Sequence, residues 1–324
     1  MPSSQLGLDR DIAMQLLQAA ILAPSSHNTQ PWKFRLHDGG IELWADRTRA
    51  LPVNDPDDRE LTISCSCALF NLRVAAAHAE VPVHISLLPD PHNNELLATV
   101  DMAASSTASP DLAELQEAMR HRRTYRKAFA ERVVPTRLTE ALVHAAAQEH
   151  AWLQPISGAT ARHAVAALVA EGDAAQWANP SWRRELGMWM HPKRRGDGMT
   201  VPGLAVPVAQ AVVRTFDMGH GVGAKDQQLA DASPLLAVLG TDADGPEHWL
   251  LAGQALQRVL LVAYGLGLQA SYLNQPVQVP GLRPKLQDLM GRTGFPQVLL
   301  RLGYPADTLP ASPRRVLNDA MDLT

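Results

Sequence analysis

Thiols are scarce in this sequence of 324 residues: Cys65 and Cys67 are the two cysteines. They are expected on a helix, where side chains two positions apart point in different directions, so the pair suits neither a disulfide nor a metal clip. We interpret both as small buried residues. The twelve histidines show no HExxH or other metal-ligand spacing, and we predict no metal.

An excess of either charge is also missing. The 29 Lys and Arg nearly balance the 33 Asp and Glu, which gives a formal charge of -4. A surface for nucleic acid or anionic membrane needs excess cations, so we expect neither partner, although a local basic pocket for one phosphate remains open. No apolar run reaches the roughly 20 residues of a membrane span, and MPSSQLGLDRDIAMQLL lacks the pattern of a signal peptide. We therefore expect a cytoplasmic protein.

Apolar periodicity predicts an α+β fold built in two rounds. In the first round we predict two helices and four strands: Asp9–Ala23 and Glu60–Ala79, then Trp32–Leu36, Ile41–Ala45, Val83–Leu88 and Leu96–Met102. In the second round we predict four helices and four strands: Leu112–Arg120, Pro135–Glu149, Ala159–Glu171 and Glu247–Gly265, then Trp152–Ile156, Leu235–Gly240, Ser271–Leu273 and Val298–Gly303. The Ser-rich stretch 103–110 is the best linker, so we divide the chain into 1–108 and 109–324.

The two rounds resemble each other. CALFNLRVAAAHAEVPVHI, from Cys67, aligns with QALQRVLLVAYGLGLQASY, from Gln254, and each is followed by a further strand. Duplication of a whole domain would explain this, and chance similarity between two buried helices is the alternative. The halves also differ in a complementary way, because each carries one polar element that the other lacks. Two such elements brought together by the fold would make one site.

The polar element of the second half is the basic segment HRRTYRKAF, from His121. Its spacing predicts that Arg122 and Arg126 share a helix face. Arginine forks suit phosphate oxygens, and Thr124 adds a hydroxyl donor. A second basic element is the Arg314–Arg315 pair near the end of the sequence. Solvated surface charge is the alternative for both elements.

The polar element of the first half is the loop PSSHNTQPW, which runs from Pro24 to Trp32. Its short donors and acceptors, braced by proline at both sides, suit the edge of a planar heterocycle. An ordinary turn is the alternative.

These elements resemble those of the flavin-dependent nitroreductases. Members of that family carry an Arg-Arg-Ser-x-Arg-like segment, here RRTYR, and a Pro-Ser-x-x-Asn-x-Gln-Pro-Trp-like loop, here PSSHNTQPW. YGLGLQASYLNQP is similar to the family's glycine-rich helix end, and PRR to its C-terminal basic segment. The loop precedes the arginine segment, an order that resembles the Acg-like branch, in which one polypeptide looks like a nitroreductase dimer.

The resemblance implies a nitroreductase-like α+β fold, an intramolecular pseudo-dimer that is monomeric as a chain, and one FMN. It implies that the phosphate and ribityl end is held by Arg122, Arg123, Thr124, Arg315 and Arg314, with Arg126 near the pyrimidine side of the ring. It places Ser25, Ser26, Asn28 and Gln30 at the ring from the other half, and Leu273 and Asn274 by its central ring. Gln228, or Lys225, matches a polar position at the flavin edge only loosely. The segment Tyr272–Asn274 departs from the family's Pro-x-Glu-like arrangement, which puts the contact to flavin N5 in question.

The stretch Gly172–Lys225 is expected to be irregular and to insert a lid over the flavin, with Gly219–Gly223 as flexible backbone. Its apolar residues could pack on the ring or form a separate hydrophobic cluster: Trp177, Trp182, Met188, Trp189 and Met190.

Three functions follow. The first is an NAD(P)H oxidoreductase that reduces a small acceptor such as a nitroaromatic or quinone, with no catalytic side chain because the flavin carries the chemistry. The second is an FMN storage protein, and the third is a relative that binds no flavin.

Overall fold

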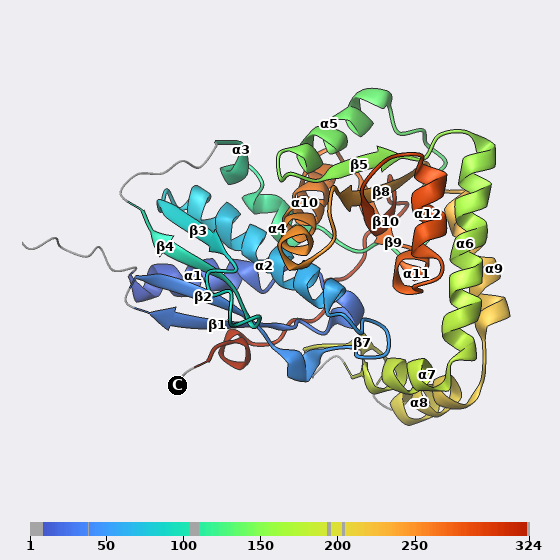
Figure 1. Ribbon diagram of the computed structural model, residues 1–324, viewed down its shortest axis with the longest axis horizontal. Coiled ribbons are helices and arrows are strands. Elements are labelled where there is room, and N and C mark those ends of the chain that lie inside the picture. Colours follow the sequence, from blue (N-terminus) through green and yellow to red (C-terminus); the bar gives the residue numbers. More distant parts are fainter. Residues whose placement is uncertain (1–8, 38, 104–109, 193–195, 203–204, 323–324) are drawn as a thin grey trace, which may run out of the picture.

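A computed structural model describes residues 9–37, 39–103, 110–192, 196–202 and 205–322. It has an α+β architecture with two four-stranded antiparallel sheets on either side of two central helices (Figure 1). The proposed linker lies largely outside the described residues, and the division at 108/109 lies outside them altogether.

The first sheet has the strand order β1-β2-β4-β3. Its residues alternate between core and surface, as in β1, where Trp32 and Phe34 are fully buried. The elements of this half are α1 (Arg10–Ala20), β1 (Trp32–His37), β2 (Gly40–Ala45), α2 (Arg59–His78), β3 (Val83–Leu87) and β4 (Leu96–Met102), with short 3-10 turns η1 (Ser26–Asn28) and η2 (Arg47–Arg49).

The second sheet has the order β5-β8-β10-β9. Taking strands in chain order, both sheets follow one scheme: first, second, fourth, third. In both, a 20-residue helix joins the second strand to the third, α2 in one half and α10 in the other. The elements are α5 (Thr136–Ala147), β5 (Trp152–Pro155), β8 (Leu235–Thr241), α10 (Pro246–Gly265), β9 (Gln269–Tyr272), α11 (Gln275–Gln278), α12 (Arg283–Met290), β10 (Phe295–Gly303) and the 3-10 turn η5 (Leu317–Ala320).

Helices α2 and α10 pack directly on each other between the sheets (Figure 1). Seventeen of the twenty residues of α2 are buried. This helix is long and apolar enough to cross a membrane by length and composition, but 83% of its apolar window is buried inside the protein, which makes it a core helix. Cys65 and Cys67 lie on it as free, buried thiols, as predicted.

The stretch predicted to be irregular is mostly helical, so that prediction was wrong. The inserted elements join β5 to β8, where the first half has only the short turn between β1 and β2. They are α6 (Ala159–Ala178), α7 (Pro180–Met188), β6 (Met190–His191), β7 (Met199–Thr200), α8 (Val206–Thr215) and α9 (Gly219–Asp231). Gly219 and Gly223, read as flexible backbone, lie inside α9, where the lack of a side chain lets α9 approach α6 closely.

Two further predictions need correction. The helix expected at Leu112–Arg120 is two short helices, α3 (Pro110–Ala113) and α4 (Gln116–His121). Arg122 and Arg126 do not share a helix face, because α4 ends at His121. The segment after it pairs with the edge strand β9 instead: Thr124 bridges Ala270, and the Tyr125 N–H donates to Ala270 O at 2.8 Å. Strand pairing outcompetes a helix here because β9 offers unpaired backbone groups.

Candidate functional site

A cavity of about 450 Å³ lies where the two halves and the insertion meet. Its walls come from the loop after α1, from α2 and α10, from the segment after α4, from β9 and β10, from the insertion and from the tail before η5. The residues that line it include Leu22, Pro24, Ser25, Ser26, His27, Asn28, Glu60, Arg122, Arg123, Thr124, Arg126, Asp173, Trp177, Trp182, Asp226, Tyr272, Leu273, Asn274, Gln275 and Arg314.

One end of the cavity is cationic, with Arg122, Arg123, Arg126 and Arg314 in its lining. Arg122 is buried, and its Nη2 donates a long bond to Leu22 O at 3.4 Å. Arg314 Nη2 donates to the same carbonyl at 3.1 Å, so the two guanidinium groups converge. Within the described part of the chain, none of these four arginines forms an ion pair.

Several donors at this end have no partner. Arg122 Nε, Arg123 Nε, Arg314 Nε and the Tyr272 hydroxyl are buried and make no hydrogen bond within the described residues. Burial, followed by repulsion from Arg122 and Arg123, lowers the pKa of Arg314 to about 9. Burial raises the pKa of Tyr272 to about 12. Unpaired buried cations are costly, so this end is built to receive an anion.

The loop from the first half faces this end in a strained conformation. His27, Asn28 and Gln30 all have positive φ angles, between 49° and 56°, which non-glycine residues rarely adopt. The Ser25 hydroxyl holds the loop by accepting the Gln30 N–H at 2.9 Å. Asn28 Oδ1 accepts from Arg314 Nη1 at 3.3 Å, so the loop touches the cationic end directly. Strain of this kind concentrates at functional sites.

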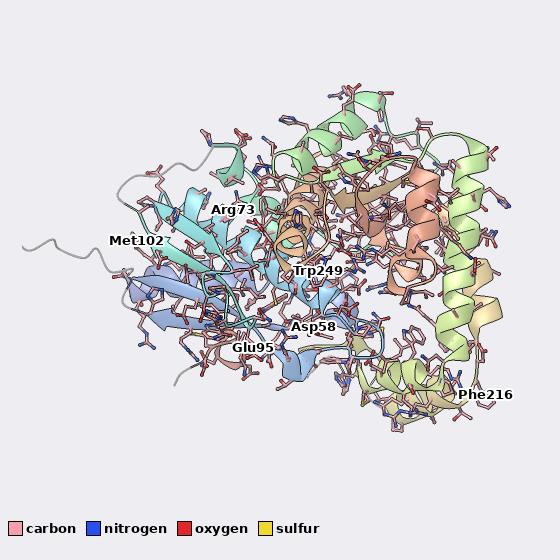
Figure 2. All side chains as sticks on the ribbon, viewed as in Figure 1. Asp58, Arg73, Glu95, Met102, Phe216 and Trp249 are labelled. Carbon is pink, nitrogen blue, oxygen red and sulfur yellow. The ribbon has the colours of Figure 1, made fainter. Side chains whose placement is uncertain are left out.

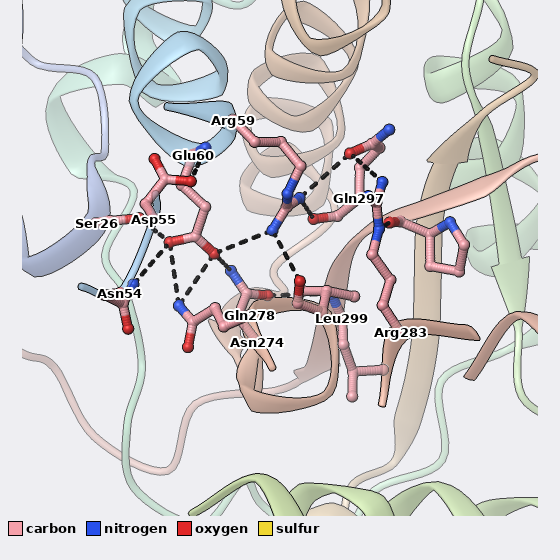
Figure 3. Close-up of polar contacts among 12 residues, drawn as sticks. Ser26, Asn54, Asp55, Arg59, Glu60, Asn274, Gln278, Arg283, Gln297 and Leu299 are labelled. Carbon is pink, nitrogen blue, oxygen red and sulfur yellow. Dashed lines mark hydrogen bonds and ion pairs between the residues drawn. The ribbon is translucent and has the colours of Figure 1, made fainter. Parts of the chain in front are cut away.

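Glu60 lines the cavity and connects the two halves through hydrogen bonds (Figure 3). It is 3% exposed and accepts from Ser26 Oγ at 2.7 Å in the first half. From the second half it accepts from Asn274 Nδ2 at 3.2 Å and from Gln278 Nε2 at 3.0 Å. Burial and the nearby Glu60 raise the pKa of Asp55 to about 6. Sequence reasoning missed Glu60, although a charged residue at the start of so apolar a helix was a usable signal.

His27 lies in the same wall and stays neutral near pH 7. Burial is the largest cause and lowers its pKa to about 4, against the opposing effect of Glu60. Its Nδ1 is buried without a hydrogen-bond partner among the described residues. A neutral imidazole beside the arginines leaves the cationic charge to the guanidinium groups.

Ten of the thirteen residues predicted for the site line this one cavity, including Ser26 and Arg122. Gln30, Arg315 and Gln228 are not among the lining residues. Gln30 Oε1 accepts the Arg315 N–H at 3.0 Å, and Arg315 Nη1 donates to Gln30 O at 3.0 Å, so this pair ties the tail to the loop. Gln228, like Lys225, is an exposed residue of α9 outside the lining.

The insertion lines part of the cavity and is fastened to the first half. Trp177 and Trp182 form a small hydrophobic cluster with Val213, as one of the two interpretations expects, and they also line the cavity. Their packing on a flavin ring stays a prediction. Glu185 accepts the N–H groups of Val53 and Asn54, each at 2.9 Å. Met188, Trp189 and Met190 do not line the cavity. Phe216 lies at the outer edge of the insertion and is 60% exposed (Figure 2).

Comparison with known proteins gives relatives along nearly the whole chain. A Mycobacterium tuberculosis protein assigned as an NAD(P)H nitroreductase is 32% identical over 323 residues, which cover 97% of this chain and 92% of the relative. This chain belongs to the nitroreductase family. The M. tuberculosis nitroreductase Acg is 27% identical and covers 95% of this chain and 95% of its own, and PigM of a Serratia species is 26% identical and covers 94% and 92%. No family model matches.

Solved structures give more distant likenesses to this nitroreductase. NfnB, an FMN- and NADPH-dependent nitroreductase from a Sphingopyxis strain, has 19% identity and a TM-score of 0.44, and covers 65% of this chain and 98% of its own. A nitroreductase with bound FMN from Bacteroides fragilis has 15% identity and a TM-score of 0.38, with 63% and 94% covered. Membership of the family therefore rests on the sequence relatives.

Proposed function

We propose that this nitroreductase is an FMN-dependent NAD(P)H oxidoreductase with one flavin in the cavity. The observation that carries the proposal is a set of arginines that have no ion-pair partner in the described part of the chain. They converge, in one cavity, with the strained loop of the other half. An FMN carries a dianionic phosphate at one end and a planar heterocycle at the other. These two chemistries match the two polar elements that the cavity joins.

The donor set fits the phosphate end. The buried Nε atoms of Arg122, Arg123 and Arg314 have no acceptor among the described residues, and Thr124 adds a hydroxyl at the same wall. Charge-assisted hydrogen bonds to phosphate oxygens would satisfy these groups. Because Arg315 Nη1 already donates to Gln30 O, we assign phosphate binding by the C-terminal tail to Arg314 alone.

The middle of the cavity fits the heterocycle. Ser25, Ser26 and Asn28 would read its polar edge from the first half, and Leu273 with Asn274 would lie against it from the second. Asn274 is fixed from two sides, because its Nδ2 donates to Glu60 and its Oδ1 accepts the Leu299 N–H at 3.1 Å. Arg126 would stabilise the negative charge that a reduced ring acquires. When bound, the flavin would supply hydride chemistry, from NAD(P)H to a small acceptor such as a nitroaromatic or quinone.

The pseudo-dimer belongs to this proposal. The shared strand order of the two sheets, and the packing of α2 on α10, support an origin by duplication in which each half kept one element of the site. The insertion between β5 and β8, which belongs to the second half, would cover the flavin. A cytoplasmic location stays a prediction.

An anaerobic stopped-flow experiment tests the function. The FMN-loaded protein is mixed with NADH and, separately, with NADPH, and the flavin absorbance is followed. Bleaching by either nucleotide, with reoxidation on adding a quinone, is the expected result. A protein that takes up no FMN would contradict the proposal.

FMN storage is the second candidate, and the fastening of the insertion favours it. Glu185 and the hydrogen bond from Trp182 Nε1 to Asn54 Oδ1, at 2.8 Å, hold the insertion shut over the cavity. If this closure persists, neither nucleotide nor acceptor can reach the ring. Full FMN occupancy without bleaching by either nucleotide would decide for storage.

A further inference from the structure

The end of the cavity formed by the insertion is acidic and is not used by the flavin assignment. Asp173 of α6 and Asp226 of α9 both line the cavity. Gln275 of α11 bridges them, because its Nε2 donates to Asp173 Oδ1 at 3.1 Å and to Asp226 Oδ2 at 3.0 Å. Three separate helices therefore converge on one carboxylate pair.

Two glycines make this convergence possible. A Cβ placed on Gly172 would lie 2.6 Å from Gln275 Cβ, closer than real atoms approach. A Cβ on Gly223 would lie 3.3 Å from Ala170 O and 3.5 Å from Asp173 Cβ. The backbone is thus shaped to bring α9 and α11 onto α6 beside Asp173, at a cost in helix propensity.

Asp173 and Gln275 present acceptors that no donor of the described residues satisfies. Asp173 is 3% exposed, yet its Oδ2 has no hydrogen-bond partner among the described residues. Gln275 Oε1 is likewise buried without a partner. Buried acceptors are normally paired, so two adjacent orphans at a cavity wall point to a ligand that donates hydrogen bonds.

The charge of Asp173 is also uncompensated. Burial raises the pKa of Asp226, against the opposing effects of the hydrogen bond from Gln275 and of the cations Arg301 and Lys225. Asp173 has no such cation: burial and Asp226 raise its pKa to about 7. A positively charged ligand group would supply the missing counter-charge.

The surroundings are apolar. Trp177 lies one helical turn after Asp173 on α6, and Val222 and Leu229 of α9 line the same cavity. We propose that Asp173, Asp226 and Gln275 form a subsite for the protonated amine of a small apolar molecule. A role of this subsite in recognising the electron acceptor rests on the proposed function. Binding of the amine does not, because it requires no turnover.

Equilibrium binding tests the subsite without any reaction. Isothermal titration of the FMN-loaded protein with 2-phenylethylammonium at about pH 8 is compared with titration by 2-phenylethanol, which has a similar shape but no charge. We expect the ammonium to bind at least about tenfold more tightly, a difference of about 1.4 kcal/mol. Asp173→Asn, which keeps the shape of the side chain, is expected to abolish this preference.

Asp231→Asn is the matched control. Asp231 is an exposed residue of α9, the helix that also carries Asp226, and it lies outside the cavity lining. This substitution should leave the preference unchanged. Retained FMN absorbance in both variants shows that they are folded. Equal affinity for the ammonium and the alcohol, or a preference that survives Asp173→Asn, overturns the subsite. FMN uptake is measured independently, by the absorbance spectrum. Failure of the flavin proposal is therefore distinguishable from failure of the subsite.

Discussion

Arg122 and Arg314 share the carbonyl of Leu22 as a hydrogen-bond acceptor, although they are 192 positions apart in the sequence. Neither has a carboxylate partner within the described residues. A folded chain tolerates two such buried cations only when a binding partner, or the rest of the fold, offsets their desolvation. A bound anionic ligand therefore explains the position of these two arginines better than a contribution to the stability of the fold does.

Replacing Arg122 should weaken FMN binding. Arg122→Ala removes charge-assisted contacts worth about 1.5–3 kcal/mol, so the Kd for FMN should rise by roughly 10- to 150-fold. Fluorescence titration of FMN measures this. Arg137→Ala, at an exposed position of α5, is the control and should bind like the parent. Unchanged affinity in Arg122→Ala would contradict the phosphate assignment.

Asp173 should make the protein less stable as the pH rises. Its pKa is about 7 in the folded state against an ordinary value of 3.8, so folding disfavours the ionised form, and stability is lost as the pH rises from about 4 through 7. Asp173→Asn should therefore exceed the parent in free energy of unfolding at pH 8 by up to about 4 kcal/mol. Urea unfolding at pH 4, 6 and 8 checks this, and a gain of equal size at all three values would refute the assignment.

Sequence reasoning located the residues that carry an obvious chemistry and missed those that hold them. Ser26 and Arg122 were predicted to share a cavity, and they do. Glu60 was missed because it follows the charged residues 57–59 and looks like the solvated start of a helix, and Asp173 because it lies between small residues, Gly172 and Ala174. Arg315 was assigned to the ligand because a basic pair does not reveal which member points inward.

At the scale of elements, the crossing of α2 and α10 fixes how closely the halves approach. Cys67 Sγ donates to Gly253 O at 3.2 Å, and Gln257 Nε2 donates to Asn71 Oδ1 at 2.6 Å, so the two helices are joined by polar contacts as well as by packing. Cys67 and Leu256 line the cavity from these helices. The separation of α2 from α10 therefore sets the width of the site.

Gly253 permits this close crossing. A Cβ there would lie 2.3 Å from Ile63 O and 2.6 Å from Ser66 Cβ. Gly253→Ala should lower the free energy of unfolding by about 1–3 kcal/mol, since α2 must move away. Gly265→Ala, on the same helix with nothing within 4 Å, should be neutral or stabilise by up to about 1 kcal/mol. Urea unfolding of the pair measures both, and equal effects would show that the crossing is not tight.

Elements with strong periodicity were predicted well, and the insertion was not. Strand β1 and helix α2 follow simple apolar patterns whose bounds the sequence predicts to within a residue. Helix α9 contains three glycines in its first five residues, a composition that disfavours a helix in isolation. Packing against α6 overrides that preference, and such tertiary contacts are not visible in the local sequence.

At the scale of the whole molecule, two sheets with one strand order share a single cavity. A symmetric dimer would form two equivalent sites. Here the arginine segment lies in the second half and the serine-asparagine loop in the first, so the likeness of the halves does not extend to the residues that bind.

We therefore expect one FMN per chain. The protein is saturated with FMN, freed of excess by gel filtration and denatured, and the released flavin is compared with the protein concentration. A ratio of one is the expected result, because the described residues of the first half offer no second cluster of unpaired arginines. A ratio of two would mean that the halves retain equivalent sites.

The attachment of the tail has a consequence for how the protein is made. Arg314 follows every other cavity residue along the chain, and beyond it Met321 bridges Phe34 at the edge of the first sheet. A ribosome releases the loop around Ser26 early, but Arg314 only after some 290 further residues. If Arg314 binds the phosphate as proposed, a nascent chain cannot complete that end of the cavity, so we expect flavin to load after Arg314 has been translated.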